Sequence, residues 1–435
     1  MRILIVADGR SPTTRRWIQG VRALGHEVVL VTTFPCAPVE GVEADVCLPV
    51  AFAALAGSGT GGAPAGKPSA AKRIVSAFRP IFLAGRYRLG PLTLRYYGPR
   101  LRWLAERLQP DLIHALRIPY EGMLAAWAPP EIPLIVSTWG NDLTLHAEGS
   151  AAMAALTRRT LARADAFMAD THRDVRLARA WGLRAESPAA VVPGSGGLDM
   201  DELAAVREKV DRWGSSFDGE LELGPDLDGT SAPLVINPRG FRTGSVRQDT
   251  FFEALPLVLE RNPKVRFACA AMAGQREAKQ WLERLNLRKQ VALLPLLPQA
   301  DLWELFARAA VSVTVSQHDG TPNSLLEAMA LGALPVAGDI ESIREWIIPG
   351  VNGLLVEPDK PQALAEAILM AVDNPGLRRR AAEDNAQIVS ERAASTVVRE
   401  QIETFYRKIA GQEVELPATE ADTSRPAPPD MPSEA

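Results

Sequence analysis

The chain has 435 residues, of which 47% are hydrophobic, so it is long enough to form two domains with filled cores. Its 48 Lys and Arg residues nearly balance its 52 Asp and Glu residues, which excludes the strongly basic composition typical of a nucleic-acid-binding protein. The widely separated Cys36, Cys47 and Cys269 fit neither a disulfide framework nor a metal site, and no segment has the roughly 20 apolar residues of a membrane span. We therefore expect a cytoplasmic protein with free thiols, no signal peptide and no nucleic-acid partner.

The first half of the chain alternates short apolar runs with amphipathic stretches. Residues 3–7 predict a strand, residues 15–24 a helix and residues 27–32 a second strand, which together form a βαβ unit. The Gly- and Pro-rich residues 57–69 predict a mobile surface loop. Four more apolar runs predict the other elements of a domain at residues 1–198: 110–116, 133–143, 162–169 and 189–193.

The second half repeats this alternation after a change of composition. The charged, then Gly-, Asp- and Pro-rich residues 199–232 predict an interdomain connection with a short helix. A second α/β domain is expected at 233–395, a C-terminal helix at 396–410 and a disordered tail at 411–435. The expected strands of this second domain include 234–237, 266–271, 290–294 and 311–315. Its expected helices are 249–261, 275–286, 300–308, 322–331, 342–347 and 361–373. The chain is therefore predicted to form two Rossmann-like, doubly wound α/β domains that face a cleft.

Residues 311–337 combine a strand, a polar loop, a helix and a second strand, in that order. Thr321 is a natural N-cap, Pro322 suits the first helical position, and the helix is expected to stop at Gly332. In open parallel sheets, ligands bind where the strands end, and phosphate groups bind at helix N-termini. We therefore expect an anion site to which residues 321–324 contribute free backbone amides.

Glu327 is the residue of this helix that most needs a partner. It is the only charged side chain between Gly320 and Gly338, and most of its neighbours on the helix are apolar. A buried carboxylate without hydrogen-bond donors costs several kcal/mol. Sugar hydroxyls are suitable donors, whereas neighbouring backbone groups or solvent are the alternative.

The segment HDGTPNSLLEAMALGALPV, residues 318–336, resembles the donor-site signature of the retaining family 4 nucleotide-sugar glycosyltransferases, and the similarity extends over about residues 1–410. The resemblance implies the GT-B fold, in which the first domain binds mainly the acceptor and the second binds the donor. The family signature is two acids separated by seven residues, here Asp319, where relatives have Glu, and Glu327. It implies that Asp319 contacts the transferred sugar and that Glu327 binds the ribose hydroxyls. The expected donor loop also includes Gly320, Thr321, Pro322, Asn323 and Ser324.

Relatives neutralise the donor diphosphate with an Arg after the first strand of the second domain and a Lys several residues later. Arg239 occupies the first position, and no Lys follows at the usual distance. Arg242 and Arg247 are the candidates to replace it, because phosphoryl oxygens accept bidentate hydrogen bonds from guanidinium groups. A solvated loop cation is the alternative interpretation of each arginine.

The first domain departs from most relatives at two places. Residues 9–14 replace a Gly-Gly pair, and Ser11 and Thr13 are candidates to approach the donor phosphate or the acceptor. The family's His-Gly-x-Asp element reads Trp-Gly-Asn-Asp at residues 139–142, so the imidazole is missing and Asp142 is the expected acceptor-side carboxylate. His318 borders the donor loop, where it either contacts the sugar or belongs to a turn.

The resemblance implies a retaining transfer of a sugar from a nucleoside-diphosphate donor to a hydroxyl group. It also implies front-face displacement with no metal ion and no cofactor apart from the donor substrate. The expected partners are a nucleotide sugar and a glycan or lipid-linked acceptor, as in the synthesis of cell-surface glycans or glycolipids. The alternatives are a nucleotide-sugar epimerase of the same fold and a non-catalytic nucleotide-sugar-binding protein.

Residues 67–105 contain nine basic residues and no acidic one, with many aromatic and aliphatic residues among them. Such a segment suits an anionic membrane surface or a lipid-diphosphate acceptor. We expect reversible peripheral binding to the inner face of the membrane. The alternative is a lobe of the first domain whose arginines pair with acids elsewhere in the fold.

Overall fold

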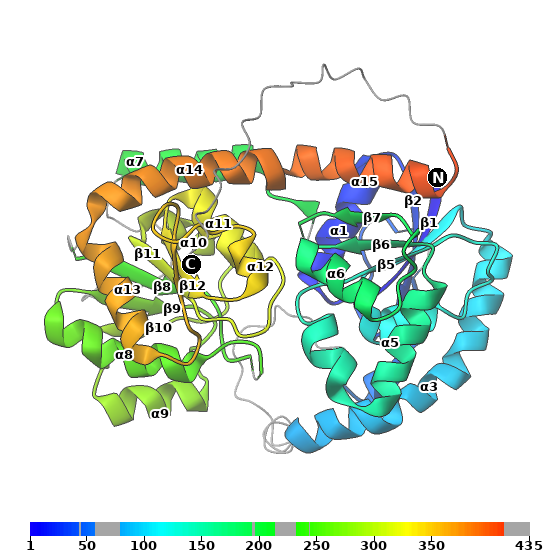
Figure 1. Ribbon diagram of the computed structural model, residues 1–435, viewed down its shortest axis with the longest axis horizontal. Coiled ribbons are helices and arrows are strands. Elements are labelled where there is room, and N and C mark those ends of the chain that lie inside the picture. Colours follow the sequence, from blue (N-terminus) through cyan, green and yellow to red (C-terminus); the bar gives the residue numbers. More distant parts are fainter. Residues whose placement is uncertain (43–44, 57–78, 194–195, 214–231, 243, 413–435) are drawn as a thin grey trace, which may run out of the picture.

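The structure is a computed structural model that describes residues 1–42, 45–56, 79–193, 196–213, 232–242 and 244–412. Two α/β domains lie side by side, each built on one sheet of parallel strands (Figure 1). The first sheet has the order β3-β2-β1-β4-β5-β6-β7, and the second has the order β10-β9-β8-β11-β12-β13. In each sheet the chain starts in the middle and winds outward in both directions, so the prediction of two doubly wound, Rossmann-like domains is confirmed.

Most strands are short and buried on both faces, as parallel sheets covered by helices require. The first sheet contains β1 (Arg2–Ala7), β2 (Glu27–Thr32), β3 (Asp45–Cys47), β4 (Leu112–Ala115), β5 (Leu134–Ser137), β6 (Ala166–Ala169) and β7 (Ala189–Val191). The second contains β8 (Leu234–Asn237), β9 (Arg266–Cys269), β10 (Val291–Leu293), β11 (Val311–Thr314), β12 (Leu334–Gly338) and β13 (Leu354–Val356).

Helices cover both faces of each sheet (Figure 1). The helices before β8 are α1 (Pro12–Ala23), α3 (Arg79–Leu108), α4 (Met123–Ala125), α5 (Ala151–Arg163), α6 (His172–Ala180) and α7 (Met200–Trp213). Those after it are α8 (Gln248–Arg261), α9 (Arg276–Leu285), α10 (Gln299–Arg308), α11 (Asn323–Leu331), α12 (Glu341–Arg344), α13 (Pro361–Asp373), α14 (Pro375–Ala393) and α15 (Ser395–Ile409). Within the described residues, no helix is both long enough and apolar enough to cross a membrane.

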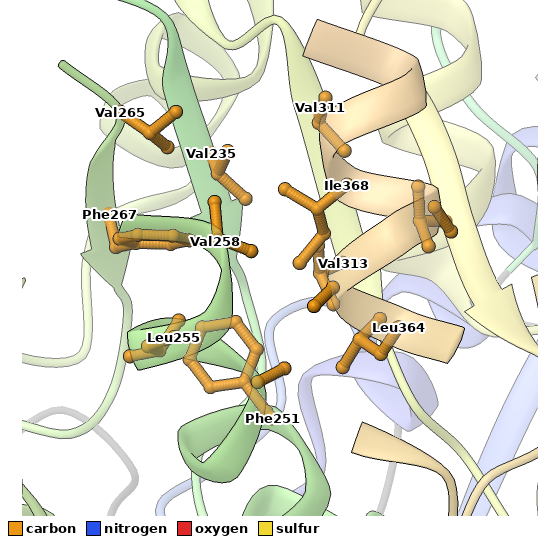
Figure 2. Packing of buried hydrophobic residues seen from close by; sticks show 14 of the residues in the cluster. Val235, Phe251, Leu255, Val258, Val265, Phe267, Val311, Val313, Leu364 and Ile368 are labelled. Carbon is orange, nitrogen blue, oxygen red and sulfur yellow. The ribbon is translucent and has the colours of Figure 1, made fainter. Parts of the chain in front are cut away.

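The core of the second domain lies between its sheet and two helices that cover one face. Figure 2 shows Val235, Val311 and Val313 of the sheet next to Phe251 of α8 and Ile368 of α13. These side chains are fully or almost fully buried, and they belong to one continuous apolar cluster. This packing fixes the strand ends from which the loops of the candidate site emerge.

The last helix of the described chain returns to the first domain. After α14 has crossed the second domain, α15 packs against α1 (Figure 1). The hydroxyl group of Tyr406 is hydrogen-bonded to His114 Nδ1 at 2.6 Å and accepts a hydrogen bond from Trp17 Nε1 at 3.2 Å. Because Val398 and Ile402 are also buried in this cluster, α15 is part of the core of the first domain.

Two long helices, α3 and α14, were not predicted from the sequence. Helix α3 contains Pro91 and Pro99, which usually interrupt a helix because proline has no N–H group. Here the Ser150 hydroxyl donates to the carbonyl oxygen of Tyr87, the group that Pro91 leaves without its helical donor. The expected loop at 57–69, residues 214–231 of the connection and residues 413–435 of the tail lie outside the described residues.

Candidate functional site

Two adjoining cavities lie between the domains, where the strands of both sheets end. The first, which we call the Arg117 cavity, has a volume of about 360 Å³ and is lined by Arg117, Asp8, Ser11 and Asn141, among others. The second, which we call the Glu327 cavity, has a volume of about 370 Å³ and is lined by Glu327 and by other residues from loops and helices of the second domain. The residues common to both cavities are Thr13, Trp139, Gly140, Arg239, Arg242 and Asp319. The two cavities therefore form one continuous cleft with the shared residues at its centre.

The Glu327 end of the cleft is built from the segment that the sequence singled out. Pro322, Asn323, Ser324 and Glu327 line it, and Gln299 of α10 faces them. The first N–H groups of α11 have no partner within the helix and carry the positive end of its dipole. This end of the cleft can bind an anionic group next to a set of hydroxyl donors.

Glu327 is buried, and Gln299 Nε2 donates a hydrogen bond to its Oε1 at 3.1 Å. Burial in this apolar helix raises the pKa of Glu327 to about 7. Its carboxyl group is therefore close to the balance between its neutral and charged forms at neutral pH. A hydroxyl donor placed in the cavity would favour the charged form.

The start of α11 differs from the prediction. The N-cap is Pro322 rather than Thr321, and the helix begins at Asn323. The N–H group of Thr321 donates to Asp170 Oδ2 at 3.0 Å, and the Thr321 hydroxyl donates to the Asp170 carbonyl oxygen at 2.6 Å. The expectation of a free amide at Thr321 is therefore wrong, because a carboxylate from the first domain occupies it.

At the centre of the cleft, charged groups of the second domain come together. Asp319 accepts hydrogen bonds from Arg239 Nη1 and, at 3.0 Å, from the Ser316 hydroxyl. Arg242 lines both cavities and has no ion pair within the described residues. The nearby positive charge of Arg239 lowers the pKa of Arg242, and partial burial lowers it further. Two arginines with one carboxylate between them leave a net positive charge that suits a diphosphate.

Three predicted site residues do not line these cavities. Arg247 pairs with Asp249 at 2.8 Å beside the start of α8 and lies outside both cavities, so its interpretation as an arginine of the diphosphate site is wrong. The carboxylate of Asp142 is buried beneath Arg117, from which it accepts a hydrogen bond at 2.7 Å. Asp142 therefore orients Arg117 and does not face the cleft itself. Gly320 is backbone of the donor loop, packed against Asp170.

Two predicted residues of the first domain, Ser11 and Thr13, lie at the cleft, as does His318 of the second. Ser11 lines the Arg117 cavity and also caps α1, because its hydroxyl accepts from the Thr14 N–H at 3.4 Å. Thr13 lines both cavities, and His318 lines the Arg117 cavity. Trp139, which replaces the family histidine, lies where the two cavities meet.

Sequence reasoning missed Arg117 and Asp170. Each follows a predicted strand of the first domain within one or two residues, since β4 ends at Ala115 and β6 ends at Ala169. The rule that ligands bind at the carboxyl ends of parallel strands could have identified both.

Comparisons with known proteins agree with this architecture. Residues 8–194 match the glycosyl transferase 4-like domain, and residues 243–388 match the group 1 glycosyl transferases. The phosphatidyl-myo-inositol mannosyltransferase of Mycobacterium tuberculosis is 29% identical over 245 residues, which are 54% of this chain and 58% of that protein. The alpha-D-kanosaminyltransferase of Streptomyces kanamyceticus is 24% identical over 163 residues, which are 37% of this chain and 42% of that protein. The chain thus spans less than two thirds of either relative.

Solved structures share the fold at low sequence identity. HepE of Anabaena in complex with UDP is 18% identical with a TM-score of 0.63, and the match covers 94% of this chain and all of that one. The sucrose-phosphate synthase of Thermosynechococcus elongatus is 16% identical with a TM-score of 0.66, covering 94% of this chain and 99% of the other. One family match falls in each α/β domain, and together they cover more than half of the chain. The chain belongs to the family 4-like glycosyltransferases of the GT-B fold.

Proposed function

We propose that this protein transfers a sugar from a nucleoside-diphosphate donor to a hydroxyl acceptor with retention of configuration. The observation that carries the proposal is the order of groups along the cleft. Glu327 and the first turn of α11 lie at one end, Arg239, Arg242 and Asp319 lie at the centre, and the Arg117 cavity lies at the other end. This order matches the ribose, diphosphate, sugar and acceptor of a bound substrate pair.

Each group has a role in this arrangement. The ribose hydroxyls donate to Glu327, and the diphosphate binds Arg239, Arg242 and the free amides of α11. The transferred sugar lies near Asp319, and the acceptor enters through the Arg117 cavity. Because solved neighbours of this fold hold UDP or UDP-glucose, UDP-sugars are the first donors to test.

The reaction proceeds on one face of the sugar. The bond between the anomeric carbon and the phosphate oxygen breaks, and the acceptor oxygen forms a bond to the same carbon from the same side. The acceptor proton passes to the leaving phosphate oxygen. Negative charge grows on the diphosphate in the transition state, where Arg239 and Arg242 stabilise it.

A panel of nucleotide sugars with lipid and glycan acceptors, followed by mass spectrometry and NMR, tests the proposal. Free nucleoside diphosphate together with an α-configured product from an α-linked donor supports retaining transfer. A changed sugar that remains attached to its nucleotide would show epimerisation instead. Binding without turnover across the panel would show a non-catalytic protein.

We expect sugar transfer to persist in excess chelator. The positive charge that a metal ion would bring to the diphosphate is supplied in this proposal by two arginines and the α11 dipole. The measurement is the initial rate with and without EDTA. A rate that vanishes with EDTA and returns when a divalent cation is added back would contradict this prediction.

We also propose that helix α3 docks on an anionic membrane surface. Arg88, Leu92, Tyr96, Trp103 and Arg107 follow one another at intervals of four or seven residues, so they share one face of α3, and all five are exposed. We call this set the α3 stripe. The Tyr96, Trp103 and Leu92 side chains are 56–59% exposed, which is unusual for large apolar groups.

The charges around the α3 stripe favour docking over pairing within the fold. Among the described residues, the one ion pair of this helix joins Arg102 to Glu106 at 3.0 Å, and Arg100 stacks on Tyr96 at 4.0 Å. The predicted basic residues Lys67, Lys72 and Arg73 lie outside the described residues. Aromatic and basic groups on one face suit the headgroup region, where a lipid-linked acceptor would be met.

In liposome flotation at low salt, the protein should bind vesicles that contain phosphatidylglycerol and release them at high salt. Replacing Tyr96 and Trp103 with Ser should abolish flotation. Met370→Ser, which changes an exposed apolar side chain on α13, should not. Equal binding to neutral and anionic vesicles, or none to either, would contradict electrostatic docking.

A further inference from the structure

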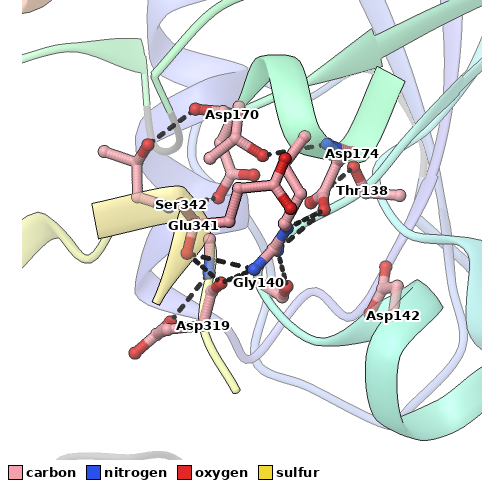
Figure 3. Close-up of polar contacts among 12 residues, drawn as sticks. Thr138, Gly140, Asp142, Asp170, Asp174, Asp319, Glu341 and Ser342 are labelled. Atoms are coloured by element: carbon pink, nitrogen blue, oxygen red, sulfur yellow. Dashed lines mark hydrogen bonds and ion pairs between the residues drawn. The ribbon is translucent and has the colours of Figure 1, made fainter. Parts of the chain in front are cut away.

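The N-terminus of α6, in the first domain, contacts the donor loop of the second domain (Figure 3). Its contacts involve residues 319–321 of that loop. Asp170, which follows β6, accepts hydrogen bonds from the N–H and hydroxyl groups of Thr321. The N–H groups of His172 and Arg173 donate to the carboxylate of Glu345, both at 2.9 Å. This end of α6 therefore faces the second domain, where Arg173 is buried and His172 stays exposed.

Arg173 is buried at this boundary, and its guanidinium group donates to both domains. Nη1 donates to the carbonyl oxygen of Asp319 at 2.6 Å and to the Ser342 hydroxyl at 3.0 Å. Nη2 donates to the carbonyl oxygen of Gly140 at 3.1 Å, and Nε donates to Asp174 Oδ1 at 2.8 Å. A buried, planar, five-donor group is thus used to join a cleft-lining loop of one domain to a cleft-lining loop of the other.

The donor loop has little freedom under these contacts. The Ser342 hydroxyl donates to the same Asp319 carbonyl oxygen at 2.8 Å, so that carbonyl is held by two donors. A Cβ atom at Gly320 would lie 2.2 Å from Asp170 Oδ2, so the loop approaches the carboxylate too closely for any larger residue. Since the backbone on both sides of Gly320 is fixed, the direction of the Asp319 side chain is fixed as well.

We propose that Arg173, supported by Asp170, is a positioning residue for sugar transfer. Both act through the backbone of the donor loop and hold the Asp319 carboxylate at the centre of the cleft, where the two cavities meet. This inference rests on the proposed function for the identity of the reaction. Glu327, Arg242 and the first turn of α11 all belong to the second domain. Loss of Arg173 should therefore reduce turnover much more than it reduces nucleotide binding.

The test compares two arginines one turn apart on α6. The variant Arg173→Met with Asp174→Leu removes the Arg173–Asp174 ion pair as a whole, so that neither partner is left without the other. The matched control is Arg176→Met. Arg176 also contacts the second domain, because it forms an exposed ion pair with Glu341 at 2.6 Å. Thermal unfolding checks that each variant folds. Arg173→Lys keeps the charge without the planar set of donors and should restore turnover only partly.

The double variant should lower kcat about 100-fold, the effect of a small misplacement of a reacting group. Its Kd for UDP, measured by calorimetry, should stay within about threefold of the wild-type value, and Arg176→Met should change neither quantity. Unchanged kcat in the double variant would overturn the proposal. So would a loss of UDP affinity in parallel with kcat, because Arg173 would then only maintain the fold of the donor site.

Amide hydrogen exchange separates this inference from the proposed function. If the wild-type protein transferred no sugar from any donor, the proposed function would fail, but exchange at Thr321 in the protein alone would still test positioning. Faster exchange in the double variant than in Arg176→Met supports the role of Arg173. Equal exchange in the two variants overturns it.

Discussion

Glu327→Gln should remove nearly all sugar transfer and, above pH 7, should make the folded protein more stable. The amide keeps the size of the side chain but loses the charge that the ribose hydroxyls would recognise. Hydrogen bonds to charged groups contribute about 1.5–3 kcal/mol each, so losing two of them lowers kcat/KM by at least a hundredfold. Initial rates with a fixed donor and acceptor measure this loss.

The stability effect follows from the raised pKa of Glu327, about 7 in the folded protein. In the unfolded chain a Glu ionises near pH 4.3, so between about pH 4.3 and 7 the folded state holds a proton that the unfolded state has lost. The free energy of unfolding therefore decreases as the pH rises through this window. Above pH 7 the loss is constant, on the order of 3 kcal/mol, and Gln avoids it.

Urea unfolding at pH 4.5 and pH 8 measures the difference. The free energy of unfolding of Glu327→Gln should equal that of the wild type at pH 4.5 and exceed it at pH 8. Glu304→Gln is the control, because Glu304 is also buried on a neighbouring helix but pairs with Lys209. Replacing Glu304 with Gln should therefore not raise the free energy of unfolding at pH 8. Full activity in Glu327→Gln would remove the central assignment of the donor site.

Arg242→Gln should weaken binding of a nucleoside diphosphate by about 10- to 100-fold without lowering stability, since a hydrogen bond to a charged group contributes about 1.5–3 kcal/mol. Arg242 has no carboxylate partner within the described residues, and Arg239 repels it. Its replacement therefore breaks no ion pair and relieves an unfavourable contact. Calorimetry with UDP gives the affinity, and thermal unfolding gives the stability.

Arg247→Gln is the matched control, since it removes the same charge from the same region of the chain. Arg247 pairs with Asp249 outside both cavities, so the variant should bind UDP as the wild type does. Equal losses in the two variants would mean that general positive charge, and not the position of Arg242, binds the diphosphate. The comparison also decides between the two arginines that the sequence left equivalent.

The sequence predicted most of what depends on neighbouring residues. The segment around Glu327 is continuous, and its strand, loop and helix bring the site residues together locally. Arg242 and Arg247 lie in an irregular loop with no period, so nothing in the sequence showed which of them faces the cleft. Helix α3 was missed because its prolines break the helical pattern, and a distant serine compensates for one of them.

Contacts between the domains could not be predicted from the sequence for a different reason. Asp170 and Thr321 are separated by 151 positions in the sequence, and they meet only because two domains, each built on its own sheet, pack against each other. No local pattern marks Arg173 as buried, since a charged residue in the first turn of an amphipathic helix usually meets solvent. Only the packed structure shows that this turn faces a second domain.

The return of α15 to the first domain sets the order in which this protein can fold as it is synthesised. Tyr406 is synthesised 292 residues after its partner His114, so the first half of the chain leaves the ribosome with part of its core uncovered. The second domain, whose strands all precede α14, can fold before the first is complete. A chain cut after residue 394 should therefore lose the fold of its N-terminal half first, although the cut lies at the other end of the sequence.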